Sequence, residues 1–214
     1  MNTIIPRYEF RAFAQSFGLV EDKIRSSSAC EKYRESREVY ILSADNSENN
    51  TKIRDGRMDI KVLEKKQQGL EQWSPRMKGG FPMAVETICD EVFPAFGVSV
   101  PQLKRSHYTL DQFLNEVIAP HRELSAAQLF KRRFGFTVNG CITEIGELLV
   151  NAAAIKTVAV ESEDAEAVLQ TQEMLGLREY ENVNYLLAIK RIIGMEPLSV
   201  WYTRGGEKDN GNGN

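Results

Sequence analysis

The chain has 214 residues, of which 42% are hydrophobic and 27% charged, and its formal net charge is −3. This length and composition are typical of one globular domain or a closely joined pair, with a genuine core. The acidic balance argues against generic nucleic-acid binding, which needs a surplus of lysine and arginine. No apolar run reaches the ~20 residues of a membrane helix, so we expect no membrane association.

The sequence predicts no secretory signal and contains none of the common site motifs. No basic segment followed by a long apolar stretch opens the chain, so we expect no secretory signal and a cytoplasmic location. The three cysteines form no CxxC pair and the two histidines form no HxxxH, which disfavours a disulfide framework and a thiolate or histidine metal site. There is also no GxxxxGKS, GxGxxG, GxSxG or HExxH motif.

The first third of the chain predicts mostly strands. Their expected ranges are 5–12, 37–44 and a hairpin over 51–63 that turns at Asp55 and Gly56, with a short helix within 16–28. The positions of Lys65 and Lys66 are interpreted as a solvated loop. Trp73 and Trp201 are interpreted as packing residues near loops rather than as clamps for an organic substrate.

The remaining two thirds predict a helical insertion, a second group of strands and two closing helices. The insertion covers about 82–120, where Thr109 and Gln112 have capping-box spacing. Strands follow at 128–138, 141–150 and 155–162, and helices at 164–176 and 182–194. Because strands and helices do not alternate, the fold class is α+β with a mainly antiparallel sheet. We expect one domain over 1–200 and a disordered tail over 203–214.

Charged residues gather on one face of the predicted strands. Counting alternate residues along each strand gives seven basic against three acidic members, although the whole chain has 27 Lys and Arg against 30 Asp and Glu. The set consists of Arg7, Glu9, Arg11, Lys52, Arg54, Lys61, Lys131, Arg133, Glu161 and Glu163.

This ionic face has two interpretations. It is the solvated side of an antiparallel sheet, whose lysines and arginines guard the edges, or the sheet curls into a closed or nearly closed barrel with its ionic side inward. An inward face would make a cationic tunnel with a few carboxylates. Such a tunnel suits a triphosphate together with a divalent metal ion.

Five segments resemble motifs of the CYTH superfamily, the triphosphate tunnel metalloenzymes, which include thiamine triphosphatases, inorganic triphosphatases and class IV adenylate cyclases. RYEFR at residues 7–11 resembles the ExExK signature, TKIRDGRMDIKVL a basic hairpin and FKRRFGF a KxR strand. TVAVESEDAEAVLQTQEMLGL resembles an acidic strand and its helix, and NVNYLLAI the closing helix. The resemblance runs from about residue 5 to 195.

The resemblance implies a triphosphate-tunnel barrel with flanking helices and assigns roles to its residues. The implied phosphate ligands are Arg11, Lys52, Arg54, Lys61, Lys131 and Arg133. Glu9 and Glu161 are the implied catalytic acids, and the implied ligands of Mg²⁺ or Mn²⁺ are Glu9, Glu144, Glu161 and Glu163.

Two departures from the family pattern weaken the metal site. Arg7 stands where the signature has its first acid, and Ala159 stands where one of a later pair of acids is expected. Arg11 replaces the signature lysine. With fewer carboxylates and added arginine charge, this strand matches phosphate binding better than metal binding.

The function predicted from these residues is metal-dependent hydrolysis of inorganic triphosphate or a nucleoside or organic triphosphate. The alternative is a catalytically degenerate CYTH-like module that binds a phosphorylated ligand or a protein partner. Adenylate cyclisation is a family variant that no feature of the sequence selects. The sequence does not predict the oligomeric state.

Overall fold

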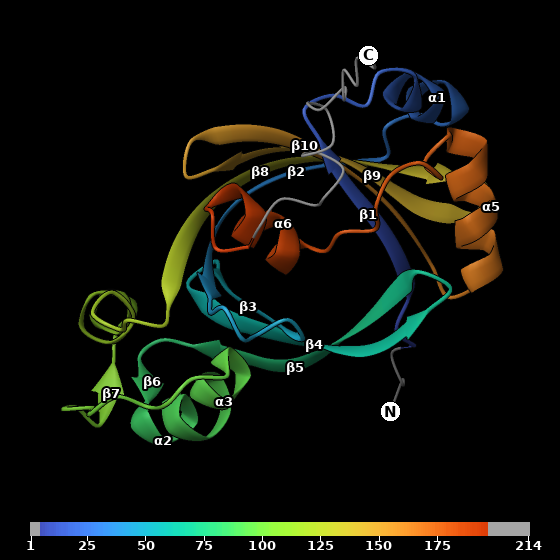
Figure 1. Ribbon diagram of the computed structural model, residues 1–214. Helices are drawn as coiled ribbons and strands as arrows, with labels where there is room; N and C mark the ends of the chain where they lie inside the picture. The colour runs from blue at the N-terminus through green and yellow to red at the C-terminus, as the bar shows by residue number, and fades with distance from the viewer. Residues whose placement is uncertain (1–4, 197–214) are drawn as a thin grey trace, which may run out of the picture.

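The computed structural model describes residues 5–196, and its centre is a closed barrel of eight antiparallel strands (Figure 1). Around the barrel the strands follow the order β1, β10, β9, β8, β2, β3, β4, β5. The predicted α+β class and the closed barrel are confirmed. The predicted tail over 203–214 and Trp201 lie outside the described residues. The strands are β1 (Tyr8–Ala14), β2 (Lys32–Leu42), β3 (Asn49–Arg54), β4 (Arg57–Gln67), β5 (Leu70–Gly80), β8 (Ser125–Val138), β9 (Cys141–Val150) and β10 (Ala153–Ser162).

Tight turns connect neighbouring strands in two places, and the first of them is the predicted turn at Asp55 and Gly56. Asp55 and Gly56 join β3 to β4, and Asn139 and Gly140 join β8 to β9, and all four have positive φ. Two consecutive positive φ values give a turn whose twist matches that of the strands, which is why Asp-Gly and Asn-Gly pairs favour it.

Strand β5 and the end of β4 differ from the sequence-based expectation of a loop at Lys65 and Lys66. Both lysines lie in β4, and a turn at Gln68 and Gly69 leads directly into β5. Strand β5 was not predicted from the sequence because it contains Pro75, and proline rarely occupies a strand interior. Here it sits at a register shift, where the pairing of β4 with β5 is irregular.

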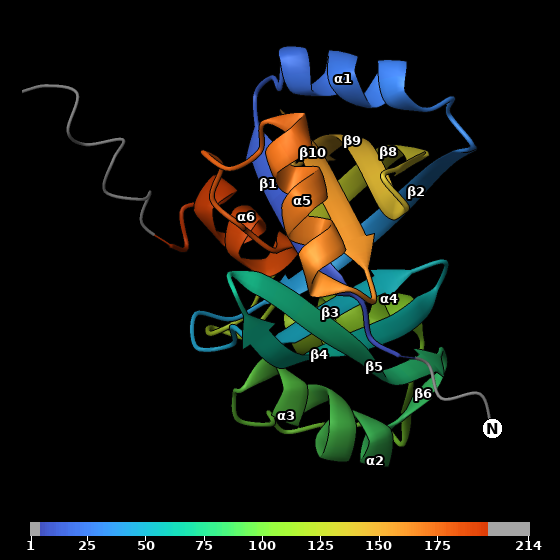
Figure 2. The same cartoon turned by 90° about the vertical axis from the view of Figure 1, so that its right-hand side faces the viewer.

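Two helices cover the outer face of the barrel, one beside β8 and the other beside β1, β9 and β10 (Figure 2). They are α1 (Leu19–Ser27) and α5 (Ala165–Leu175). Phe10 on β1 points outward and belongs to the same buried cluster as Ile24 of α1 and Val168 of α5. Burial of this apolar side of β1 directs its charged side into the barrel, because successive strand residues face opposite ways.

The predicted insertion packs against another part of the outer surface. Its short elements are β6 (Met83–Ala84), α2 (Val85–Thr87), a π-helical turn (Ile88–Val92), α3 (Phe93–Phe96), β7 (His107–Tyr108), α4 (Leu110–Gln112) and a second π-helical turn (Phe113–Ile118). Thr109 and Gln112 form the predicted capping box. Phe93 packs with Ile53 and Ile60 from the hairpin β3–β4, so the apolar side of that hairpin also faces outward. Figure 2 shows α2 and α3 beneath β4 and β5.

The last helix, α6 (Tyr185–Ile192), lies across one end of the barrel (Figure 1). Its Leu186 and Ile189 join Leu42 and Leu129 from the barrel interior in one buried cluster. This end of the interior is therefore filled with apolar side chains. No helix within residues 5–196 has the length and apolar character needed to cross a membrane.

Candidate functional site in the barrel interior

A polar cavity of about 140 Å³ occupies the barrel interior next to α6. It brings together nine of the ten predicted site residues, so the ionic faces of the strands do face inward. The roles given to these residues stay predictions. The cavity is lined by Glu9, Arg11, Glu38, Asn50, Lys52, Arg54, Lys61, Trp73, Lys131, Arg133, Glu144, Glu161, Asn184 and Tyr185.

The basic half of the cavity surrounds Glu38. Strand β2 supplies this carboxylate, which is 2.9 Å from Nζ of Lys131, 3.8 Å from Nζ of Lys52 and 3.9 Å from Nη1 of Arg54. Its side chain is only 1% exposed. Burial opposes its ionisation, yet the positive charges of Lys131, Lys52 and Arg54 prevail and lower the pKa of Glu38 to about 2.

Lys131 is the most deeply enclosed cation of this half. Its Nζ donates a hydrogen bond to Oη of Tyr40 at 3.0 Å and lies 3.6 Å from the ring centroid of Tyr185. Burial, followed by the charge of Lys52, lowers the pKa of Lys131 well below its ordinary value. An anion entering this half would favour the charged form of Lys131.

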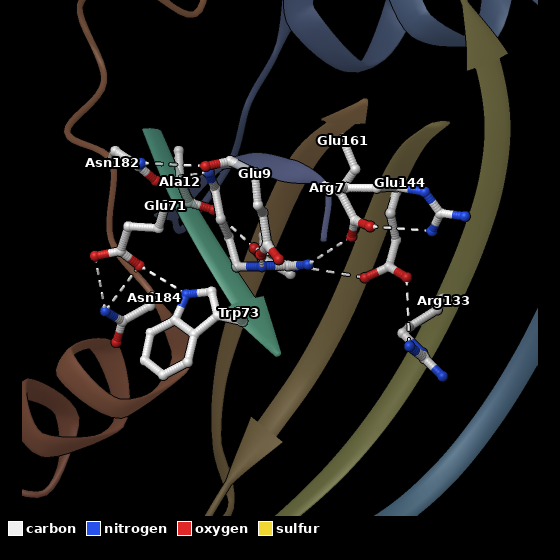
Figure 3. A network of polar contacts seen from close by, with 12 residues as sticks. Arg7, Glu9, Ala12, Glu71, Trp73, Arg133, Glu144, Glu161, Asn182 and Asn184 are labelled. Atoms are coloured by element: carbon white, nitrogen blue, oxygen red, sulfur yellow. Dashed lines mark hydrogen bonds and ion pairs between the residues drawn. The ribbon is translucent and has the colours of Figure 1, made fainter. Parts of the chain in front are cut away.

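The acidic half of the cavity surrounds Arg11 with the carboxylates of Glu9, Glu144 and Glu161. Figure 3 shows these three glutamates close together. Nε of Arg11 donates to Oε1 of Glu9 at 2.5 Å, and Nη1 donates to Oε1 of Glu144 at 3.4 Å. Nη2 lies 3.8 Å from Oε1 of Glu161. The two halves are thus reciprocal, with a glutamate among cations on one side and an arginine among carboxylates on the other.

Strand register explains this arrangement. Glu9 on β1 lies directly opposite Glu161 on β10, and Arg11 lies opposite Ala159. Ala159 therefore places no charged side chain directly opposite Arg11. Burial and the nearby charge of Glu9 raise the pKa of Glu161 to about 7.

Glu163 is the predicted site residue that the structure does not bring into this cavity. It lies just beyond the end of β10, is exposed and lines an adjoining outer cavity of about 380 Å³ together with Arg7 and Glu161. Glu163 has the same strand parity as Glu161, which lines the cavity. Strand β10 ends at Ser162, however, so the carboxylate of Glu163 does not join those of Glu9, Glu144 and Glu161.

The carboxylates of the acidic half do not fit a divalent metal ion. Besides their contacts with Arg11, Glu144 lies 3.5 Å from Nη1 of Arg133, and Glu161 lies 3.9 Å from Nη1 of Arg7 (Figure 3). Across residues 5–196, no group of three or more His, Cys, Asp or Glu side chains is arranged to hold a metal ion. The predicted carboxylates are arranged around guanidinium groups.

Several cavity residues were missed by the sequence analysis. Glu38 lies within the predicted strand 37–44, and its parity with buried Tyr40 would have placed it inside. Trp73 donates from Nε1 to Oε2 of Glu71 at 3.0 Å, and Asn184 donates from Nδ2 to the same carboxylate. The interpretation of Trp73 as a packing residue near a loop is wrong, because it lies in β5, the strand that Pro75 obscured, and lines the cavity.

A second adjoining cavity of about 300 Å³ extends the cationic surface toward solvent. Five of its lining residues are basic, namely Arg7, Lys32, Arg34, Arg54 and Arg133. Arg34 and Arg133 lie directly opposite each other across β2 and β8. Nε of Arg133 is buried, and it finds no hydrogen-bond partner in the part of the chain that the structure describes.

The chain matches no family model and no curated protein by sequence. Among solved structures, it aligns over 88% of its length with 96% of HpAC1 from Hippeastrum, an adenylyl cyclase candidate with a dominant triphosphatase activity (13% identity, TM-score 0.47). It aligns over 86% of its length with 98% of the protein PH1012 from Pyrococcus horikoshii OT3 (17% identity, TM-score 0.48). It aligns over 85% with 97% of an adenylate cyclase candidate from Bacillus halodurans (9% identity, TM-score 0.48).

Proposed function

We propose that the barrel binds a triphosphate-containing small molecule in its interior and hydrolyses one of its phosphoanhydride bonds. The observation that carries this proposal is the concentration of six Lys and Arg side chains around one enclosed cavity, against four Glu side chains. Enclosing an excess of cations is costly unless an anion compensates them. A triphosphate supplies several negative charges and many acceptor oxygens in an extended chain.

Two further observations support an anionic ligand. Like charges directly opposite each other in a sheet are destabilising, and Arg34 faces Arg133 in this way. A buried donor without a partner is also costly, and Nε of Arg133 is such a donor among the described residues. A phosphate oxygen near Arg133 would relieve both costs. The adjoining cationic cavity leads to the same residue.

The proposed reaction uses groups on both sides of the cavity. A water oxygen attacks the terminal phosphorus, and the bond from that phosphorus to its bridging oxygen breaks. The carboxylate of Glu161, which makes no hydrogen bond to another described residue, accepts the proton of the water. Lys52, Arg54 and Lys131 stabilise the negative charge of the phosphate chain as that bond breaks. Glu9 holds Arg11 in place beside the reacting phosphate.

A non-catalytic phosphate-binding module is the second candidate. It is favoured by the engagement of Glu9, Glu144 and Glu161 with arginine side chains, which lowers their capacity to position a metal ion or activate water. The Mg²⁺ or Mn²⁺ predicted from the family resemblance stays a prediction. We route no step of the proposed reaction through a metal ion, because the three carboxylates do not fit one.

Phosphate release and ligand binding, measured in parallel, test the proposed function. Purified protein is incubated with tripolyphosphate, ATP, GTP or thiamine triphosphate, in EDTA and in Mg²⁺, and binding is followed by calorimetry. We expect release that Glu161→Gln abolishes with binding retained, and that Arg54→Ala lowers by weakening binding. Binding without release supports the second candidate. Absence of binding to every compound contradicts both.

A further inference from the structure

We propose that Arg11 is a built-in cation that takes the place of a divalent metal ion, so that this site excludes Mg²⁺ and Mn²⁺ and binds phosphate without them. The second half of this inference rests on the proposed function. The first half concerns only the residues of the acidic half and is tested independently of any phosphorylated ligand.

The charges of the acidic half are already compensated. Three arginine side chains contact the trio of Glu9, Glu144 and Glu161. Arg11 contacts all three carboxylates, and Arg7 and Arg133 each contact one of them. A divalent metal ion attracted to this trio would also meet the positive charge of Arg11 within the same few ångströms. The excess negative charge that holds Mg²⁺ in its usual sites is missing here.

Arg11 also keeps its charge and its position. Burial disfavours its charged form, but the surrounding carboxylates prevail and raise the pKa of Arg11 well above its ordinary value. Its side chain is only 6% exposed. Nη1 donates to Oγ1 of Thr157 at 3.4 Å, and the guanidinium lies 4.7 Å from the ring centroid of Tyr185. Asn182 accepts a hydrogen bond from the backbone N–H of Arg11 at 2.8 Å.

One end of the guanidinium remains available to a ligand. Nε and Nη1 of Arg11 donate to carboxylates, whereas Nη2 makes no hydrogen bond to any residue within 5–196. The oxygen of Glu161 beside it is 3.8 Å away, which is beyond hydrogen-bond distance. We assign the N–H groups of Nη2 to a phosphate oxygen. Arg11 therefore links the carboxylates to the phosphate chain, which is the bridging position of a metal ion in other phosphate sites.

Binding of Mn²⁺, followed by electron paramagnetic resonance, tests the exclusion of metal. We expect the wild-type protein to leave the signal of free Mn²⁺ unchanged at concentrations up to about tenfold over the protein. Arg11→Gln removes the central cation and keeps the three carboxylates, so it should gain a Mn²⁺ site. Arg54→Gln is the matched control, because it removes a cavity cation that contacts Glu38 and Asp59 instead of the trio. This control should gain no Mn²⁺ binding.

Calorimetry with tripolyphosphate tests the metal-free binding of phosphate. The dissociation constant in EDTA should lie within about twofold of that in buffer without chelator, and both Arg11→Gln and Arg54→Gln should weaken binding by tenfold or more. Circular dichroism checks that each variant is folded.

The outcomes separate this inference from the proposed function. Stoichiometric Mn²⁺ binding by the wild-type protein, or a tenfold loss of tripolyphosphate binding in EDTA, overturns the inference while a triphosphate ligand stands. Absence of tripolyphosphate binding in every condition overturns the proposed function and the second half of the inference together. The wild-type Mn²⁺ titration decides the first half even where Arg11→Gln does not fold.

Discussion

The carboxylate of Glu38 lies 2.9 Å from the ammonium of Lys131, and both side chains are buried inside the barrel. Since Lys52 and Arg54 also lie within 4 Å of this carboxylate, its loss leaves three cations uncompensated. Glu38→Gln should therefore lower the free energy of unfolding by about 3 kcal/mol, as measured by urea denaturation. Tripolyphosphate should stabilise this variant more than it stabilises the wild-type protein.

Glu35→Gln is the control for the Glu38 variant. Glu35 lies on the same strand but is exposed, and it pairs with exposed Arg132. Its replacement should change the free energy of unfolding by less than about 1 kcal/mol. Equal stability of the Glu38 variant and the wild-type protein would show that Glu38 does not balance the buried cations.

The pKa of Glu161 predicts how stability depends on pH. Burial and the charge of Glu9 raise this pKa from about 4.5 to about 7, so the folded state binds a proton that the unfolded state has already lost between these pH values. The contribution of Glu161 to stability is fully present below about pH 4.5 and is lost as the pH rises through 7. The loss should reach roughly 3 kcal/mol.

Urea denaturation of Glu161→Gln from pH 5 to 8 measures this contribution, since the variant should lack the decline. Glu173→Gln removes an exposed partner of Arg178 and should retain it. If the stability of Glu161→Gln declined with pH as that of the wild-type protein does, the decline would come from groups other than Glu161.

Gly146 gives space to the residue that supports Arg11. A Cβ atom at this position would lie 2.6 Å from Cγ2 of Thr157, whose Oγ1 accepts a hydrogen bond from Arg11. Gly146→Ala should therefore lower the free energy of unfolding by about 1–3 kcal/mol and weaken phosphate binding. Gly80→Ala is the control, because a Cβ atom there would meet no atom within 4 Å and no positive φ is involved. Equal melting temperatures for the two variants would contradict this account.

Trp73 should report occupancy of the cavity through its fluorescence. Its indole lines the cavity and donates to Glu71 at 3.0 Å, so a bound phosphate compound changes its surroundings. The sequence contains only one other tryptophan, Trp201, and Trp201→Phe isolates the signal. We expect tripolyphosphate to change the emission of Trp201→Phe and to leave that of Trp73→Phe unchanged. A response confined to Trp73→Phe would place the ligand elsewhere.

Strand parity predicted most of the cavity lining, because successive side chains of a strand point to opposite faces of the sheet. Phe10 and Ile53 needed an apolar environment, so their charged neighbours Arg11, Lys52 and Arg54 had to face the other way. Parity did not show how charges on different strands pair. The cluster of Glu9, Glu161 and Arg11 depends on the register between β1 and β10, which only the folded barrel fixes. The cavity position of Trp73 was not predicted because Pro75 argued against a strand at this place. In the folded chain, a register shift between β4 and β5 accommodates the proline.

The position of α6 across one end of the barrel has a consequence for the order of events at the site. Tyr185 and the apolar cluster behind it fill that end, and the two adjoining cavities are lined by no residue of α6, so a ligand of the proposed kind would enter from their side. On the proposed function, the terminal phosphate of a triphosphate would go in first, and any organic group would lie toward Trp73 and the adjoining outer cavity. If the proposed cleavage takes place there, the outer product would leave before the inner phosphate, and product release would be sequential.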